Sequence, residues 1–415
     1  MQVDCLKESL SIDRLSSLVT GREKAQFSSD FEAHRDVIAT NITGKRILVI
    51  GGAGSIGSAT IRELLPFSPA TLHVVDQNEN NLAELVRDLR SGEKLMSIPD
   101  FRTLPLDFGS PIMEAFLRNT EQYDVIMNFA AIKHVRSEKD VFSLLQMLDT
   151  NVVKQARFLR WLFETHSGAR YFCVSTDKAA NPVNLMGASK RSLEHVLFSG
   201  EVSPSSSLTV TSARFANVAF SDGSLLDSFI KRLQKHQPLA VPKNTKRYFI
   251  SLKEAGQICL LASVRAPAKS ILIPRFDPST DLLDLELVAK AVLRQYGVEP
   301  QVCLDEEEAR LNLSALLNKG QYPLLVTPLD TSGEKPYEEF VGDGETSVEV
   351  GMTNLLAVDY LAAPKGACTI FLNRVEAMLM KPDSAVGKQD IVRWLSELIP
   401  QLQHIETGKN LDQRM

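Results

Sequence analysis

KRILVIGGAGSIGSATIRELL, residues 45–65, runs from a short apolar stretch through a cluster of glycines into a helical pattern. The glycines fit two overlapping spacings, G-x-G-x-x-G and G-x-x-G-x-x-G. Glycine suits such a turn because the backbone must bend tightly and approach a pyrophosphate at the helix N-terminus. The glycines alone would also fit an ordinary strand-to-helix turn, but the flanking strand and helix favour dinucleotide binding. The residues predicted to line the cofactor here are Gly51, Gly54, Ser55, Ile56 and Gly57.

The segments that follow continue an alternation of strands and helices. Residues 71–75 form a predicted second strand that ends in Asp76, about 20 residues after the glycines, where an acid typically holds the adenosine ribose hydroxyls. The run that begins there, DQNEN, offers no cation for a 2′-phosphate, so the sequence favours NAD and leaves NADP open. A third strand is predicted to end over residues 104–107, and a fourth to span 123–129. This order predicts an α/β fold built on a doubly wound parallel sheet.

A polar cluster follows a later strand. Residues 170–175 (RYFCVS) are typical of a buried parallel strand, and a helical pattern begins near Leu185. Side chains just beyond such a strand lie where open α/β sheets bind their ligands. The helix adds two residues four positions apart, which share one of its faces. The candidate catalytic residues are Ser175, Thr176, Asp177, Lys178, Met186 and Lys190.

Composition narrows the class of protein. The 415 residues are 44% hydrophobic and 23% charged, which is typical of a soluble globular enzyme. A net charge of -5 without any long block of Lys or Arg argues against a nucleic-acid partner. The apolar runs are too short to span a bilayer. The five cysteines are scattered without a zinc-binding spacing, so we predict no metal site and reduced thiols in the cytoplasm.

The stretch STDKAANPVNLMGASK, residues 175–190, resembles the short-chain dehydrogenase/reductase superfamily, whose catalytic helix carries Tyr-x-x-x-Lys. Met186 stands at the Tyr position and Lys190 at the Lys position, and none of the seven tyrosines has a Lys four residues later. Within that superfamily the run is similar to the nucleotide-sugar 4,6-dehydratases of polysaccharide biosynthesis. These enzymes act on UDP-N-acetylglucosamine, and some of them carry Met in place of Tyr. The resemblance covers roughly residues 11–340.

The resemblance implies a tightly bound NAD or NADP that is regenerated in each turnover, a UDP-sugar substrate and a homo-oligomer. It also implies that Asp107, with Phe108 beside it, contacts the adenine, and that Ala130 and Ala131 let the cofactor lie close to the backbone. The segment GEKPYEE, residues 333–339, resembles one that helps to close the nucleotide site. The implied substrate contacts are Lys133, His134, Asn217 and Arg247, of which the arginine would clamp a diphosphate.

The resemblance further implies a reaction. Oxidation at C4 of the sugar makes the C5 proton removable, water leaves across C5 and C6, and the hydride returns to C6. Lys190 would hold the nicotinamide ribose. Asp177 would protonate the departing hydroxyl and needs a raised pKa, whereas Lys178 would remove the C5 proton and needs a lowered pKa. The hydroxyls of Ser175 and Thr176 would bind the 4-oxygen, and the thioether at the Tyr position cannot transfer a proton.

Several alternatives stay open. A nucleotide-sugar epimerase or reductase would share the fold, and a non-catalytic NAD(P)-binding scaffold would explain Met186. Residues 15–23 (LSSLVTGRE) resemble the linker that follows a membrane segment in longer relatives, and we interpret the sequence as a soluble short form. The predicted domains are a helical N-terminal arm over 1–44, a Rossmann domain over 45–220 with a returning strand near 270–275, a substrate lobe over 221–345 and a C-terminal extension over 346–415.

Overall fold

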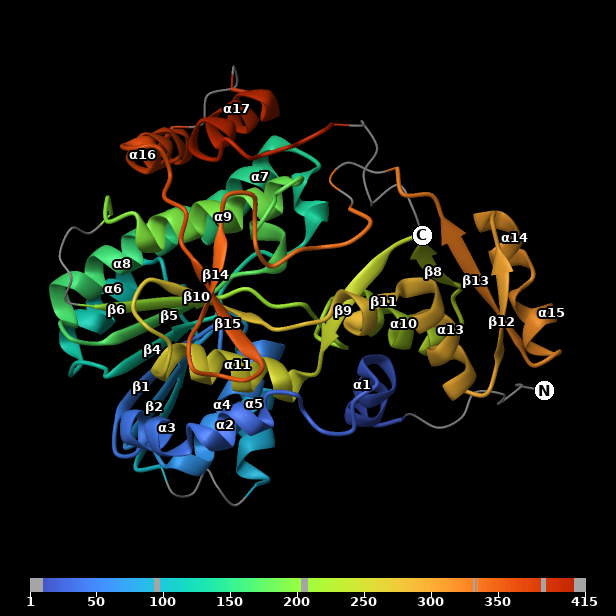
Figure 1. The fold of residues 1–415 in the computed structure, drawn as a ribbon, viewed down its shortest axis with the longest axis horizontal. Coiled ribbons are helices and arrows are strands. Elements are labelled where there is room, and N and C mark those ends of the chain that lie inside the picture. The colour runs from blue at the N-terminus through green and yellow to red at the C-terminus, as the bar shows by residue number, and fades with distance from the viewer. Residues whose placement is uncertain are drawn as a thin grey trace.

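The computed structural model describes residues 10–92, 98–202, 208–330, 333, 335–381 and 386–406. Its largest element is a nine-stranded sheet in the order β14-β15-β10-β6-β5-β4-β1-β2-β3 (Figure 1). The strands of this sheet are β1 (Arg46–Ile50), β2 (Thr71–Val75), β3 (Asp100–Leu104), β4 (Val125–Asn128), β5 (Arg170–Val174), β6 (Thr209–Ala213), β10 (Ser270–Pro274), β14 (Thr346–Glu349) and β15 (Leu355–Asp359).

The seven strands from β3 to β10 run parallel, while β15 and β14 complete one edge in antiparallel pairing. The strand order reverses between β1 and β4, so the ligand crevice of a doubly wound sheet lies at the carboxyl ends of these two strands. Central strands are buried on both faces, and β2 is buried along its whole length, which explains their continuous apolar sequences. The predicted fold class is confirmed.

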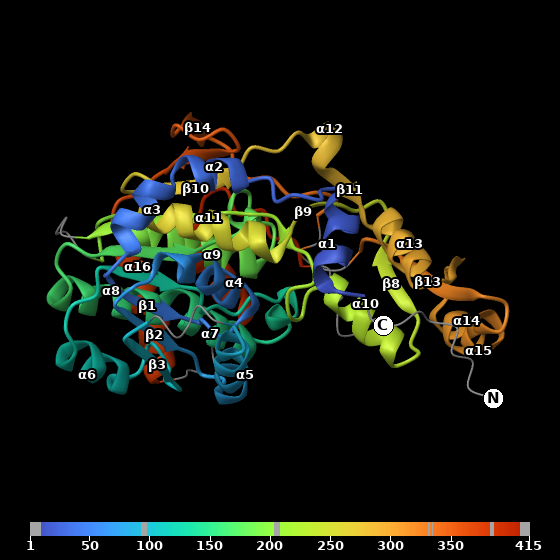
Figure 2. The same cartoon turned by 90° about the horizontal axis from the view of Figure 1, so that it is seen from below.

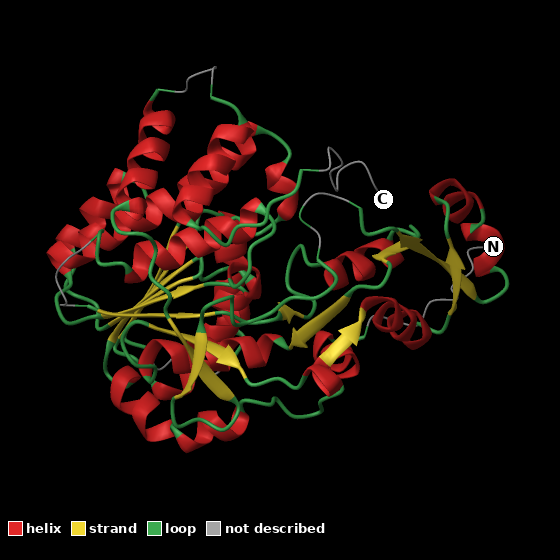
Figure 3. Ribbon diagram, turned by 45° about the horizontal axis from the view of Figure 1, so that its top comes forward, coloured by secondary structure: helices red, strands yellow, loops and turns green. Residues whose placement is uncertain are grey.

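Two layers of helices cover the sheet. One face packs α2 (Ser28–Ala33), α3 (Arg35–Ile42), α4 (Ser55–Leu64), α5 (Glu79–Arg90) and α11 (Leu252–Val264) around a common apolar core. The opposite face packs α6 (Pro111–Asn119), α7 (Val141–Leu148), α8 (Lys154–Thr165), α9 (Leu185–Phe198), α16 (Ala367–Met380) and α17 (Lys388–Leu398). Figure 3 shows these helices flanking the yellow strands on both sides.

A smaller lobe lies beside the carboxyl edge of the sheet (Figure 2). It contains one sheet in the order β12-β13-β8 and a second in the order β11-β9-β7. Its strands are β7 (Asn217–Val218), β8 (Leu239–Pro242), β9 (Lys246–Ile250), β11 (Leu282–Asp284), β12 (Glu299–Cys303) and β13 (Gln321–Thr327). Its helices are α10 (Leu225–Gln234), α12 (Pro278–Asp281), α13 (Leu285–Gln295), α14 (Glu306–Leu311) and α15 (Leu313–Leu317).

The described segments nearest the two ends of the chain pack on the rest of the protein. Helix α1 (Ile12–Thr20) buries Leu15 and Val19 in the core of the smaller lobe, whereas α2 and α3 pack on the large sheet. Toward the C-terminus, β14 and β15 join the large sheet, and α16 and α17 pack in the same helical layer as α7, α8 and α9. In the part of the chain that the structure describes, no helix combines the length and the apolar character needed to cross a membrane.

Some predicted boundaries are wrong by a few residues. The third strand ends at Leu104, three residues before Asp107, because Pro105 interrupts the ladder. The fourth strand spans only Val125–Asn128, and α4 begins directly at Ser55. Ser224 caps α10 with its hydroxyl.

Candidate active site

The glycine turn joins β1 to α4. Gly51 has a φ of 67°, and a Cβ atom there would lie 2.6 Å from the backbone nitrogen of Ala130. A Cβ atom on Gly57 would lie 2.5 Å from the carbonyl oxygen of Gly51, so α4 packs on the turn only because both residues lack side chains. Gly54 differs, since its Cβ atom would meet its nearest neighbour at 3.5 Å, and no side chain caps the helix that it begins. The first amides of α4 thus suit an anion such as a pyrophosphate.

Two predicted cofactor acids lie at the same edge of the sheet. The Asp76 carboxylate, directly after β2, accepts two backbone N–H bonds of 3.2 and 3.0 Å, which fix it beside the glycine turn. Asp107 accepts a 2.6 Å bond from Lys154 Nζ. Burial alone would raise the pKa of Asp107, but the bond from Lys154 holds that pKa below its ordinary value. The ring of Phe108 is buried and packs against Phe158 in the core.

The segment after β4 is held by a buried amide. Asn151 accepts a bond from the backbone N–H of Ile132 and donates one to its carbonyl oxygen, both at 2.8 Å. This clamp fixes the half-buried Ala130 and Ala131 against the turn, as close approach of a cofactor requires.

A loop from the smaller lobe, residues 221–223, reaches the cofactor turn. Ser55, which precedes Ile56 at the start of α4, donates its hydroxyl to the Asp222 carboxylate at 3.1 Å and accepts the Asp222 N–H at 2.9 Å. Lys133 Nζ donates to the Asp222 carbonyl oxygen at 2.6 Å. The imidazole of His134 lies against the same loop. The predicted substrate residues Lys133 and His134 therefore lie where the two lobes meet.

The candidate acid and base meet directly after β5. Asp177 is 2% exposed, and its Oδ1 accepts bonds from Thr176 Oγ1 at 2.7 Å and from Lys178 at 2.9 Å (N) and 3.1 Å (Nζ). Its Oδ2 is buried and has no hydrogen-bond partner among the described residues. A buried carboxylate oxygen without a partner costs free energy, and such groups concentrate at functional sites. The predicted convergence of these three side chains is present.

The surroundings of Lys178 act against the lowered pKa that its role as a base needs. Its Nζ lies 3.1 Å from Asp177 Oδ1 and 3.7 Å from Glu338 Oε1. Burial by itself would lower the pKa of Lys178, but the two carboxylates outweigh it and raise the pKa above the ordinary value. Lys178 is therefore an ammonium in this arrangement, whereas a base at C5 must be neutral.

Two residues predicted to contact the substrate have protein partners. Arg247 donates to the carbonyl oxygens of Lys335 at 3.0 Å and Pro336 at 3.1 Å, because the segment around residue 336 lies against β9. Its contact with a diphosphate stays a prediction. Asn217 donates its side-chain amide to the carbonyl oxygen of Tyr248 at 3.4 Å.

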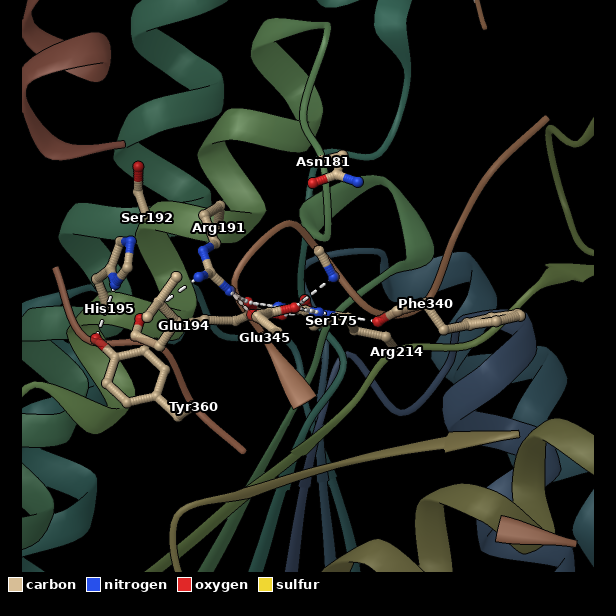
Figure 4. Close-up of polar contacts among 12 residues, drawn as sticks. Ser175, Asn181, Arg191, Ser192, Glu194, His195, Arg214, Phe340, Glu345 and Tyr360 are labelled. Atoms are coloured by element: carbon tan, nitrogen blue, oxygen red, sulfur yellow. Dashed lines mark hydrogen bonds and ion pairs between the residues drawn. The ribbon is translucent and has the colours of Figure 1, made fainter. Parts of the chain in front are cut away.

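Ser175 belongs to a buried network. Its hydroxyl donates at 2.7 Å to Glu194, inside a group of buried ion pairs, and its predicted contact with the 4-oxygen stays a prediction (Figure 4). Arg214, 0% exposed, bonds Glu194 and Glu345 at 2.6 to 2.9 Å. Arg191 also pairs with both acids. Burial would raise the pKa of Glu194, yet the neighbouring arginines hold that pKa below its ordinary value.

The catalytic helix carries the predicted Lys and Met. Lys190 is buried and donates its Nζ to the carbonyl oxygen of Val174 at 2.7 Å, and burial lowers its pKa. Met186 packs in the apolar core. Its backbone N–H donates at 3.0 Å to Glu138 Oε1. Glu138 is 5% exposed, and burial raises its pKa to about 7.

Three acids of this region were not predicted from the sequence. Glu194 lies four residues after Lys190, a helical spacing that could have located it. Glu338 lies inside the segment 333–339 that the resemblance had already marked. Glu138 follows Lys133 and His134 in an irregular stretch that carried no such spacing.

Comparison with known proteins places these features in a family. The sequence profile described as "polysaccharide biosynthesis protein" matches residues 47–359, more than half of the chain. The chain belongs to this polysaccharide biosynthesis family. Among its relatives, an uncharacterized membrane protein of Methanocaldococcus jannaschii is 32% identical over 62% of this chain and 74% of its own length.

Other similar proteins have names that state a function. The probable polysaccharide biosynthesis protein EpsC of Bacillus subtilis is 29% identical over 75% of this chain and 47% of its own length, so the chain spans about half of that relative. A UDP-N-acetylglucosamine 4,6-dehydratase (inverting) of Campylobacter jejuni is 24% identical over 67% of this chain and 90% of its own length. A crystal structure of a dTDP-glucose 4,6-dehydratase from Streptomyces venezuelae superposes with a TM-score of 0.54 at 19% identity, covering 86% and 99% of the two chains.

Proposed function

We propose that this chain is an NAD- or NADP-dependent 4,6-dehydratase acting on UDP-N-acetylglucosamine for polysaccharide synthesis. The observation that carries the proposal is the Asp177–Lys178 pair, directly after β5, with one buried carboxylate oxygen that has no hydrogen-bond partner in the described part of the chain. Relatives of similar sequence that carry this activity by name, and the shared fold, support it.

The cofactor fits the carboxyl edge of the sheet. Gly54 and the uncapped start of α4 would hold the pyrophosphate, and the fixed Asp76 would hold the ribose hydroxyls. When bound, the nicotinamide supplies a hydride acceptor that later returns the same hydride. Lys190 of α9 is buried beside Val174, the last residue of β5. Its ammonium donates one hydrogen bond to Val174, and its other N–H groups would bind the ribose next to the nicotinamide.

The protein's own groups would perform the elimination. Thr176 donates to Asp177 Oδ1 and thereby fixes the carboxyl group, whose free Oδ2 would carry the proton for the departing C6 hydroxyl. Lys178, in its neutral form, would take the C5 proton once the C4 carbonyl has made that proton acidic. Met186 lies in the core and moves no proton.

The reaction supplies the test. Purified protein, NAD and UDP-N-acetylglucosamine should give a product lighter by one water, with one deuterium at C5 when the solvent is heavy water. Deuterium placed at C4 of the substrate should reappear at C6 of the same molecule. An epimerase would return the label to C4 without loss of water, a reductase would consume reduced cofactor stoichiometrically, and a scaffold would leave the sugar unchanged.

Variants locate the chemistry. Asp177→Asn and Lys178→Ala should each lower turnover by about a hundredfold or more while keeping the fold and NAD affinity, the usual scale for loss of a general acid or base. Lys253→Ala, which removes an exposed lysine on α11, is the matched control and should keep the wild-type rate. Near wild-type rates in both site variants would place the acid and base elsewhere.

A further inference from the structure

The side chain of Lys154, the first residue of α8, lies between two carboxylates. Its Nζ donates to Asp107 Oδ2 at 2.6 Å and lies 3.4 Å from Asp149 Oδ2. The lysine side chain is 12% exposed, so water and salt screen this contact less than they screen a surface ion pair. Asp107 follows β3 at the carboxyl edge of the sheet, where the cofactor is expected. Lys154 is therefore a fixed charge beside the expected cofactor, and the proposed function gives it no role.

Gly109 makes room for this lysine. A Cβ atom on Gly109 would lie 2.3 Å from Cγ of Lys154, so the lysine stem packs directly on the backbone of the loop after β3. The Gly109 N–H donates to Asp107 Oδ1 at 2.9 Å, and Arg157 of α8 donates to the Gly109 carbonyl oxygen at 3.0 Å. The loop is thus shaped around Lys154, and the contact with Asp107 is part of the packing.

The Asp107 carboxylate keeps acceptor capacity after these contacts. Oδ1 accepts the bond from Gly109 and Oδ2 accepts the bond from Lys154. The side chain of Gln77 also bonds this carboxylate. A carboxylate offers about four acceptor positions, and the Asp107 side chain is 33% exposed. It can therefore accept a further hydrogen bond from a ligand in the crevice.

Lys154 also determines the charge of Asp107. Burial by itself would raise the pKa of Asp107, but the hydrogen bond and the charge of Lys154, together with the Gly109 N–H, hold that pKa below its ordinary value. The side chain is therefore a carboxylate, which only accepts hydrogen bonds. Such a group binds an amino donor and repels a carbonyl oxygen. Adenine carries an amino group at position 6, whereas hypoxanthine carries an oxygen there.

We propose that Lys154 makes the dinucleotide site selective for a base with an amino group at position 6, because its ammonium fixes the Asp107 carboxylate as an acceptor. The inference rests on the proposed function for its cofactor and on the expected contact between Asp107 and the adenine. Lys154 acts through Asp107 and does not touch the base, so it is a positioning residue.

Binding of two dinucleotides tests this role. NAD and nicotinamide hypoxanthine dinucleotide differ only at position 6 of the base, and calorimetric titration measures both affinities without turnover. The wild type should bind NAD about tenfold or more tightly than the hypoxanthine analogue, which is the scale of a hydrogen bond to a charged group. In Lys154→Met the unbranched stem still packs on Gly109, but the ammonium is gone and the preference for NAD should fall. Lys154→Arg keeps the charge and should keep most of the preference.

The pH profile separates the charge of Lys154 from its packing. The charged groups around Asp107 are Lys154 and, beyond it, Asp149, with Arg157 bound to the neighbouring backbone. Loss of a nearby cation raises the pKa of an acid by about one to three units. The Lys154→Met preference for NAD should therefore fall by about threefold or more between about pH 8 and 5. The wild-type preference should stay constant over that range, because the lowered pKa of Asp107 keeps it a carboxylate.

Two variants are the controls. Asp149→Asn keeps the ammonium beside Asp107, and Lys253→Met removes an exposed lysine of α11. Both should keep the wild-type preference at every pH. If Lys154→Met does not fold, Lys154→Gln, which can still donate to a carboxylate but carries no charge, should show the same pH dependence.

A Lys154→Met variant that binds both dinucleotides more weakly but keeps the wild-type preference at every pH would show a merely structural role and overturn the inference. A wild type that binds NAD and the hypoxanthine analogue equally would overturn it as well, while dehydration of the sugar by that protein would leave the proposed function intact. If the wild type binds neither dinucleotide, the inference and the proposed function fail together.

Discussion

Glu138→Gln should remove a pH dependence from the stability of the protein. Glu138 caps the start of α9 through the Met186 N–H, and burial raises its pKa from 4.5 to about 7. Between these two values the folded protein holds a proton that the unfolded chain releases. The contribution of protonated Glu138 to the free energy of unfolding is therefore fully present below about pH 4.5 and is lost as the pH rises through about 7.

The magnitude follows from the size of the shift. One unit of pKa shift is worth about 1.4 kcal/mol, so the rise of the Glu138 pKa from 4.5 to about 7 corresponds to about 3 kcal/mol in the free energy of unfolding. About 2 kcal/mol of this is lost between about pH 5.5 and 8.5. Lys388 favours the charged carboxylate and Glu406 opposes it, and both are already included in the shifted value.

Urea unfolding of the wild type and Glu138→Gln across that pH range measures the effect. The wild type should lose about 2 kcal/mol more than the variant as the pH rises, because every other titrating group is common to both. Glu32→Gln, at an exposed carboxylate on α2, is the control and should keep the wild-type slope. Equal slopes for the wild type and Glu138→Gln would refute the reasoning.

Two further predictions concern the cofactor crevice. Gly57→Ala should destabilise the fold by about 1–3 kcal/mol, since its Cβ would press on the backbone of the turn, whereas Gly54→Ala should change stability by less than about 1 kcal/mol and still weaken NAD binding. Urea unfolding and calorimetric titration separate the two outcomes, and equal stabilities would contradict the packing argument. NAD should bind at least as tightly as NADP, because Asp76 would face the added 2′-phosphate; a fluorescence titration that favours NADP would reject this role for Asp76.

Local patterns predicted the fold because they act over short distances. The glycine turn needs only the residues from β1 to α4, and its spacing appears directly in the sequence. The alternation of apolar strands with helices then leaves few possible arrangements of the sheet. The position of Thr176, Asp177 and Lys178 followed from the same logic, since they directly follow a strand.

The chemical state of those residues could not be predicted in this way. The hydroxyl of Ser175 is engaged by Glu194 on the next helix, which accepts its hydrogen bond. The raised pKa of Lys178 comes first from the adjacent Asp177 and then from Glu338, which the segment 335–345 brings beside it from a distant part of the chain. Contacts between residues far apart in the sequence depend on how the two lobes pack. The pKa of a buried group depends in turn on these contacts. The sequence could therefore locate the groups, but it could not assign their proton states.

The Arg214 network bears on the order in which the crevice is completed. Arg214 enters the core with β6, but Glu345, one of its two acids, is made 131 residues later. Until then the buried guanidinium of Arg214 has only one of the two carboxylates that balance its charge. Removing one partner of a buried ion pair costs about 3–5 kcal/mol. Glu338 is made in the same late stretch. A nascent chain that ends before residue 335 already contains the dinucleotide turn. It lacks both Glu338, the second acid beside Lys178, and the ion pair between Glu345 and Arg214. The last acid of the crevice and the last stabilising ion pair are therefore supplied by the same segment.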